Sequence, residues 1–138
     1  MFMLNELLIK DLSNQVDTNT SDIQDIKDAE VYSTNEVKTN KKWVDGKPIY
    51  RKVFMFGAMP NTTNKDIPHN ISNLGTTIKC YGMAVRTSDS RALPIPDSTP
   101  GAEITCGVSN TNVSVITYSD RSSFNDSHII IEYTKTTD

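Results

Sequence analysis

The chain has 138 residues, of which 36% are hydrophobic, enough for one domain of ordinary size and a small appendage. Its 14 basic and 17 acidic residues are interspersed and give a net charge of −3, which disfavours nucleic acid as a partner because no one-signed field can hold a polyphosphate. Low apolar content with abundant Thr, Asn, Ser and Asp predicts a polar, β-rich chain that gains burial from further copies of itself.

The apolar start of the chain, residues 1–9, is too short to span a membrane. Glu6, Lys10 and Asp11 interrupt it well before the ~20 apolar residues that a span requires. It also lacks the basic start and the small-residue cleavage site of a secretory signal. We therefore expect no membrane insertion, a mature chain that begins here, and assembly in a reducing cytoplasm.

A heptad seam follows within residues 1–30, which we call the stem. Its members are Ile9, Leu12, Val16, Asn19, Ile23 and Ile26. The alternating intervals of three and four predict a coiled coil, because a 3.5-residue period keeps a narrow stripe facing the partner helices. Asp22 and Lys27 then occupy g and e positions, which pair between chains in a parallel coil. The β-branched residues at a and Ile26 at d favour a homotrimer.

Asn19 has two interpretations. In a continuous coil its amide sacrifices some apolar burial and fixes the alignment of the chains. Alternatively, the helix breaks here, and Ser21 and Gln24 form a capping box for a second helix. Leu4 and Leu8 precede the seam out of phase, which suggests that the N-terminus anchors the chain to another protein.

Residues 31–42 are polar and have no helical period, which predicts a linker or collar. From Trp43 onward, short alternating apolar runs separated by Gly, Pro, Asn and Asp predict antiparallel strands. We expect five or six, at residues 49–56, 76–86, 93–95, 103–108, 112–118 and 128–134. Gly82 marks a bulge or a close backbone approach. The fold class is therefore mainly β, with a β-sandwich or jelly-roll-like head at residues 43–138. Because its first strand is apolar on both faces, we expect the head to trimerise as well.

No catalytic, cofactor or metal site is predicted, so we expect a protein that is not an enzyme. The two histidines, His69 and His128, have no Asp or Cys at a ligand spacing. Cys80 and Cys106 lie beside apolar strand residues, which favours buried free thiols over the alternative of a disulfide. The strand acids, Glu103 and Glu132, fit the solvent face of an alternating pattern and so do not suggest a glycosidase pair.

Several strings between residues 32 and 138 resemble bacteriophage fibre proteins. They are Tyr32-Ser33-Thr34, WVDGKPIYR at residues 43–51, HNISN at 69–73, SDRSSF at 119–124 and IEYTKT at 131–136. The nearest resemblance is to the C-terminal β domain of tail-fibre or head-fibre proteins of phages that infect gut and related Gram-positive bacteria. It implies a homotrimeric virion appendage, assembled in the host cytoplasm, with the stem attached to other virion proteins and the head displayed outward.

Two groups of head residues are candidates for ligand contact. Trp43 and Tyr50 can form a sugar-stacking platform with Asp45 as a hydroxyl acceptor; alternatively, Asp45 starts a tight turn and Trp43 covers one end of the core. Asp120 and Arg121 can form a charge-assisted pair that shapes a loop, or can contact a ligand.

Two functional hypotheses follow. In the first, a trimeric fibre binds a host-surface glycan or protein through its head, with affinity raised by three linked copies. In the second, the chain is a capsid, head-fibre or baseplate decoration with a purely structural role.

Overall fold

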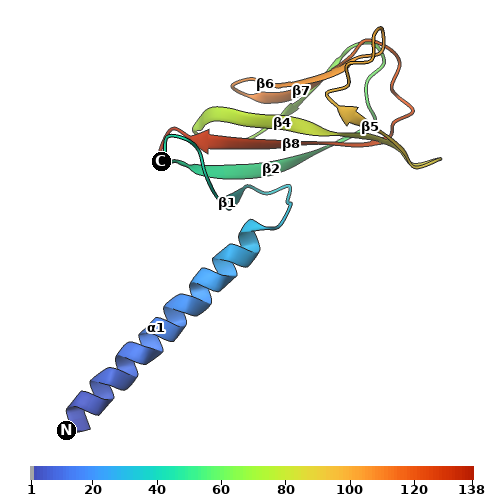
Figure 1. The fold of residues 1–138 in the computed structure, drawn as a ribbon. Coiled ribbons are helices and arrows are strands. Elements are labelled where there is room, and N and C mark those ends of the chain that lie inside the picture. The colour runs from blue at the N-terminus through green and yellow to red at the C-terminus, as the bar shows by residue number, and fades with distance from the viewer. Residues whose placement is uncertain (1) are drawn as a thin grey trace. The chain divides into compact units, whose positions relative to one another are not determined.

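The computed structural model describes the backbone of residues 2–138 and the side chains of residues 3–138. It divides into two compact units, one that ends at Val31 and one that comprises Tyr32–Asp138. The first contains a single helix, and the second, which we call the β unit, contains eight strands (Figure 1). The chain is therefore mainly β with one N-terminal helix, as the sequence predicts.

Helix α1 runs without interruption over Phe2–Ala29, a length of roughly 42 Å at 1.5 Å per residue. Side chains bridge successive turns across the region where a break was the alternative. Gln15 Nε2 donates to Asn19 Oδ1 at 2.9 Å, and Thr20 Oγ1 donates to the Val16 carbonyl at 2.9 Å. The alternative interpretation, in which the helix breaks at Asn19, is therefore wrong. Lys27 in the last turn complements the helix dipole.

The β unit contains two antiparallel sheets. The larger has the strand order β1 (Val37–Lys42), β2 (Pro48–Gly57), β8 (Asp126–Lys135), β4 (Leu74–Arg86) and β5 (Arg91–Ile95). The smaller has the order β3 (Asn64–Pro68), β7 (Asn112–Thr117) and β6 (Ile104–Val108). The predicted short edge strand at 93–95 is confirmed as β5, and the predicted hairpin after residue 108 joins β6 to β7.

The core lies between the sheets and takes side chains from both. The predicted inward face of the last strand is confirmed, because Ile129, Ile131 and Tyr133 are fully buried. The alternation is incomplete, because Thr134 is buried as well. Val113 and Val115 of β7 complete the same cluster from the smaller sheet. Burial of this kind contributes roughly 25 cal/mol per Å² of apolar surface. The central strand β8 therefore supplies a large part of the stabilisation.

Two strands were missed. β1 falls inside residues 31–42, where a linker was expected, and pairs with β2 through Val37 opposite Arg51. β3 pairs with β7 although Ile67 is its one large apolar residue. Both are edge strands that bond to a neighbour on one side only. Their backbones complete a sheet without contributing an apolar face, so periodicity did not reveal them.

The solvent-face assignment of Glu132 is also wrong, since this residue is 6% exposed. β8 is the middle strand, and Glu132 lies directly opposite Arg51 of β2 and Lys79 of β4. Lys79 Nζ is 3.7 Å from its carboxylate. The two cationic neighbours compensate the charge of the carboxylate, so it can be buried.

Candidate functional site

The seam forms an exposed apolar stripe on α1. In the single chain its apolar members are each more than half exposed: Ile9 68%, Leu12 66%, Val16 53%, Ile23 54% and Ile26 55%. A continuous helix keeps residues at this spacing on one face. Such a stripe is the geometry by which helices associate into coiled coils.

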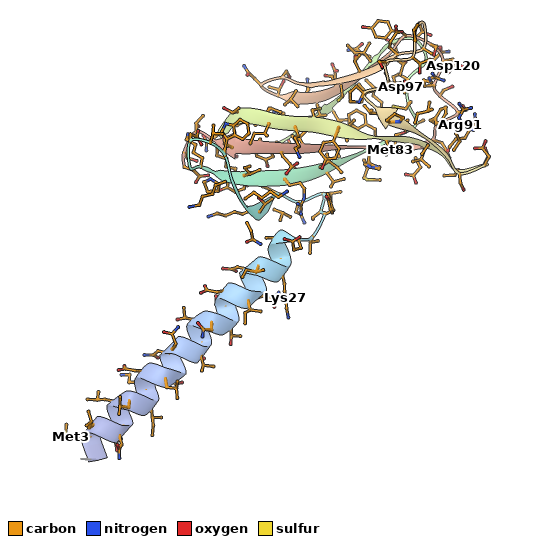
Figure 2. All side chains as sticks on the ribbon, in the orientation of Figure 1. Met3, Lys27, Met83, Arg91, Asp97 and Asp120 are labelled. Carbon is orange, nitrogen blue, oxygen red and sulfur yellow. The ribbon has the colours of Figure 1, made fainter. Side chains whose placement is uncertain are left out.

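The stripe widens near the start of the helix. Met3, Leu4, Leu7 and Leu8 are all between 56% and 77% exposed, although they lie outside the heptad positions of the seam. Figure 2 shows the side chains along α1 from Met3 to Lys27. These additional positions make the exposed apolar surface of the helix wider than a coiled-coil seam alone.

Trp43 and Asp45 form a tight turn between β1 and β2. The Trp43 carbonyl accepts from the Gly46 amide at 2.9 Å, and the Trp43 amide donates to the Lys47 carbonyl at 2.9 Å. Asp45 Oδ1 accepts from the Lys47 amide at 3.0 Å, and Gly46 supplies the positive φ of 84°. Trp43 itself is half-buried. One carboxylate oxygen of Asp45 is therefore used within the turn, by the Lys47 amide.

Tyr50 is partly buried and packs against the core cluster. Its ring stacks on that of Tyr133, with centroids 6.0 Å apart and an interplanar angle of 20°, and Lys135 Nζ lies 5.0 Å from the ring centre. Burial, followed by a hydrogen bond with Asp138, raises the pKa of Tyr50 to about 12. Glu36 accepts from the Tyr133 hydroxyl and pairs with Lys135 at 2.6 Å. The ring that stacks on Tyr50 is thus a core tyrosine.

Asp120 and Arg121 hold loops together through separate partners. Asp120 Oδ1 accepts from the amide and the hydroxyl of Ser122, at 2.9 and 2.6 Å, and these bonds lower the pKa of its carboxyl group. Arg121 donates to the Ala102 carbonyl at 3.0 Å. Figure 2 shows Asp120 and Asp97 at the same end of the β unit. These hydrogen bonds support the loop-shaping interpretation. The predicted charge-assisted pair between Asp120 and Arg121 is not among the ion pairs of the described residues.

A pocket of about 370 Å³ opens at residues that were not predicted as a site. It is lined by Pro68, His69, Asn70, Ile71, Asn110, Thr111 and Asn112, and we call it the asparagine pocket. The sequence predicts a turn at 109–111 and draws attention to the string at 69–73, but nothing in the linear order indicates that the two meet. They meet because β3 pairs with β7, which places Pro68 opposite Asn112.

The thiols are free and adjacent. Cys80 of β4 and Cys106 of β6 are both half-buried, and Cys106 Sγ donates to the Cys80 carbonyl at 3.3 Å. The preference for free thiols over a disulfide is confirmed, although neither side chain is fully buried.

Within residues 3–138, no group of three or more His, Cys, Asp and Glu side chains could hold a metal ion. The described helix is not long and apolar enough to cross a membrane. No family model matches the chain, and no curated protein or solved structure matches it either.

Proposed function

We propose that the chain is a structural subunit of a bacteriophage appendage, a homotrimeric fibre whose β unit binds a host-surface receptor or glycan. The observation that supports this most is the seam, with five apolar side chains that are each more than half exposed on an unbroken helix. Water-exposed hydrocarbon at heptad spacing is stabilised when parallel helices bury it against one another.

In this proposal α1 is the coiled-coil stem. Three copies bury the seam, and Asn19 aligns them because a shifted neighbour would place hydrocarbon against its amide. The β unit is then the jelly-roll-like end of each subunit. Three linked copies raise the avidity for a surface that carries repeated receptors.

The remaining parts of the proposal rest on the resemblance of residues 32–138 to phage fibre domains. The subunit assembles in the host cytoplasm and becomes part of the virion. The additional leucines at the start of α1, Leu4, Leu7 and Leu8, attach the stem to another virion protein. The protein acts by binding alone, without enzymatic activity or a cofactor.

A second candidate is a capsid, head-fibre or baseplate decoration with a purely structural role. Four of the residues considered for ligand contact favour it, because their side chains are engaged within the chain. Asp45 caps its turn, Tyr50 stacks on Tyr133, Asp120 accepts from Ser122, and Arg121 donates to Ala102.

Sedimentation equilibrium of the full chain tests the self-association. We expect three times the 15.4 kDa chain mass at micromolar concentration, and a monomeric mass for Ile23→Asp, which places a charge in the seam. Asn14→Asp on the opposite side of the helix is the matched control and should remain trimeric. A monomeric mass for the unmodified chain would refute the fibre proposal.

Binding of labelled full-length protein to host cells separates the two candidates. Saturable binding supports the receptor role. No binding to any host surface, together with a position on the particle away from the host-facing end in electron micrographs, supports the decoration role.

A further inference from the structure

The asparagine pocket lies where the end of β3 meets the turn between β6 and β7. Its volume of about 370 Å³ is at the lower end of the roughly 300–1,000 Å³ of small-molecule sites. The walls are two short loops, residues 68–71 and 109–112. Whether they form a binding site depends on how rigidly they are held and on which polar groups they present.

His69 fixes the two loops to each other. It is 2% exposed, and its backbone amide donates to the Thr111 carbonyl at 2.9 Å. Its Nδ1 accepts from the Ile71 amide at 3.0 Å, so the ring proton is on Nε2, which donates to the Ser109 carbonyl at 3.1 Å. One buried side chain therefore uses both ring nitrogens to hold both walls.

Two backbone amides of the second loop, residues 109–112, are hydrogen-bonded by a side chain of the same loop. Ser109 Oγ accepts from the amides of Thr111 and Asn112, at 3.3 and 3.0 Å. Asn70 in the first loop has a φ of 52°, a left-handed conformation that asparagine tolerates. His69 and Ser109 thus close the loops without the asparagine side chains, and a preorganised wall avoids the entropic cost of ordering on binding.

The polar groups that remain are uncharged. The side-chain amides of Asn70, Asn110 and Asn112 enter no hydrogen bond among the described residues of the two loops. Each carboxamide offers two N–H donors and one carbonyl acceptor. Pro68 and Ile71 add an apolar surface beside them. The neighbouring ammonium of Lys52 is bonded to the His69 carbonyl at 2.9 Å.

We propose that the asparagine pocket binds a neutral saccharide. A carboxamide that both donates and accepts matches a sugar hydroxyl, which does the same, and the apolar surface matches the C–H face of a pyranose ring. The lining residues provide no charge for an anionic or cationic ligand. This inference rests on the proposed receptor role and names the ligand class and the site for it.

The test uses the full-length chain and an immobilised panel of neutral oligosaccharides built from hexoses and N-acetylhexosamines, followed by calorimetric titration of the best ligand. We expect Asn110→Ala/Asn112→Ala to weaken that ligand about tenfold or more, since two hydrogen bonds to bound sugar are lost. Asn35→Ala removes an exposed asparagine outside the pocket and should leave the affinity unchanged.

Asn70→Gly keeps the left-handed backbone and removes the third amide, so it should also weaken binding without unfolding the loop. Failure to bind any neutral oligosaccharide at millimolar concentration overturns the inference, as does binding only to charged glycans or to peptides. If the chain is trimeric and binds host cells, but the double variant binds them equally well, the inference fails while the proposed function stands.

Discussion

Gly82 is a position where a single methyl group would break the sheet. A Cβ atom there would lie 1.9 Å from the carbonyl oxygen of His128, which belongs to the backbone of β8 and cannot move aside without shifting the strand. We expect Gly82→Ala to lower the free energy of unfolding by about 2–3 kcal/mol, measured by urea denaturation.

Gly107 provides the matched control for this change. It also lies within a strand, but an added Cβ would meet no atom within 4 Å. Gly107→Ala should change the free energy of unfolding by no more than about 0.5 kcal/mol. Equal urea midpoints for the two variants would show that β4 does not approach β8 this closely.

Tyr50, stacked on the core residue Tyr133, predicts a loss of stability at alkaline pH. Tyr50 ionises at about pH 12 in the folded chain because it is buried and bonded to Asp138, against about 10 when unfolded. Its contribution is fully present below pH 10 and is lost as the pH rises from 10 to 12, because only the unfolded chain releases the proton there. Tyrosinate absorbance should show this delayed titration, and Tyr50→Phe should remove one tyrosine from the late-titrating group, in which Tyr81 and Tyr133 remain because burial raises their pKa values as well. A normal midpoint for every tyrosine would contradict the stacked arrangement.

The adjacent thiols predict that Cys80 is unreactive. Its hydrogen bond with Cys106, together with burial, raises the pKa of the Cys80 thiol, so little of the reactive thiolate forms near neutral pH. We expect iodoacetamide to alkylate Cys80 about tenfold or more slowly in the folded chain than in urea, as followed by peptide mass spectrometry. Cys106→Ser should accelerate the folded-state reaction. Equal rates in the folded and unfolded chain would refute the prediction.

Among the elements, those that bury an alternating apolar face could be predicted from sequence, and the others could not. Ile129, Ile131 and Tyr133 reveal β8 because a period of two is needed to fill one side of it. The lysine-rich β1 and the short β3 form by backbone pairing at sheet edges, for which no local pattern is required.

The candidate site shows the same division. The seam is a local repeat and can be found in the sequence, whereas the asparagine pocket depends on the pairing of β3 with β7, which joins residues 44 to 52 positions apart. The turn at Asp45 was predicted correctly, but Tyr50 could not be matched to Tyr133 without knowing that β2 lies beside β8.

Asn19 is expected to lower the stability of the proposed coiled coil while fixing the alignment of its helices. In the single helix its amide oxygen accepts from Gln15, and burial in a seam would leave the amide among hydrocarbon. We expect Asn19→Leu to stabilise the self-associated helix by about 1 kcal/mol or more per chain and to allow assemblies of more than one size, visible as several species in sedimentation velocity. Asn14→Leu should retain one species. A single, equally stable species for Asn19→Leu would exclude the alignment role.

At the scale of the whole molecule, the proposed self-association rests on the exposed apolar stripe of the helix. The expectation that the β unit also trimerises assumed an exposed second face of β2. On that face Ile49 is 7% and Arg51 8% exposed, and Tyr32 lies under the guanidinium of Arg51 at 4.2 Å. The face is therefore covered within one chain at Ile49 and Arg51, and Met55, at 55% exposed, is its one exposed large apolar side chain.

We accordingly expect a fragment of residues 32–138 to fold and to remain monomeric at micromolar concentration. All eight strands and the core cluster belong to this unit. Far-UV circular dichroism should show β structure, and sedimentation equilibrium should give a single-chain mass, while the full chain is trimeric. An unfolded fragment would show that the β unit depends on the helix, and a trimeric fragment would restore the association of the heads.

The position of β8 also sets the order of events during synthesis. It is the last of the eight strands along the chain, yet β2 and β4 lie on either side of it and make no pairing with each other. During synthesis α1 therefore leaves the ribosome long before β8 is available to complete the larger sheet. In the proposed fibre, helices of neighbouring nascent chains can therefore associate before the domains that they carry have folded.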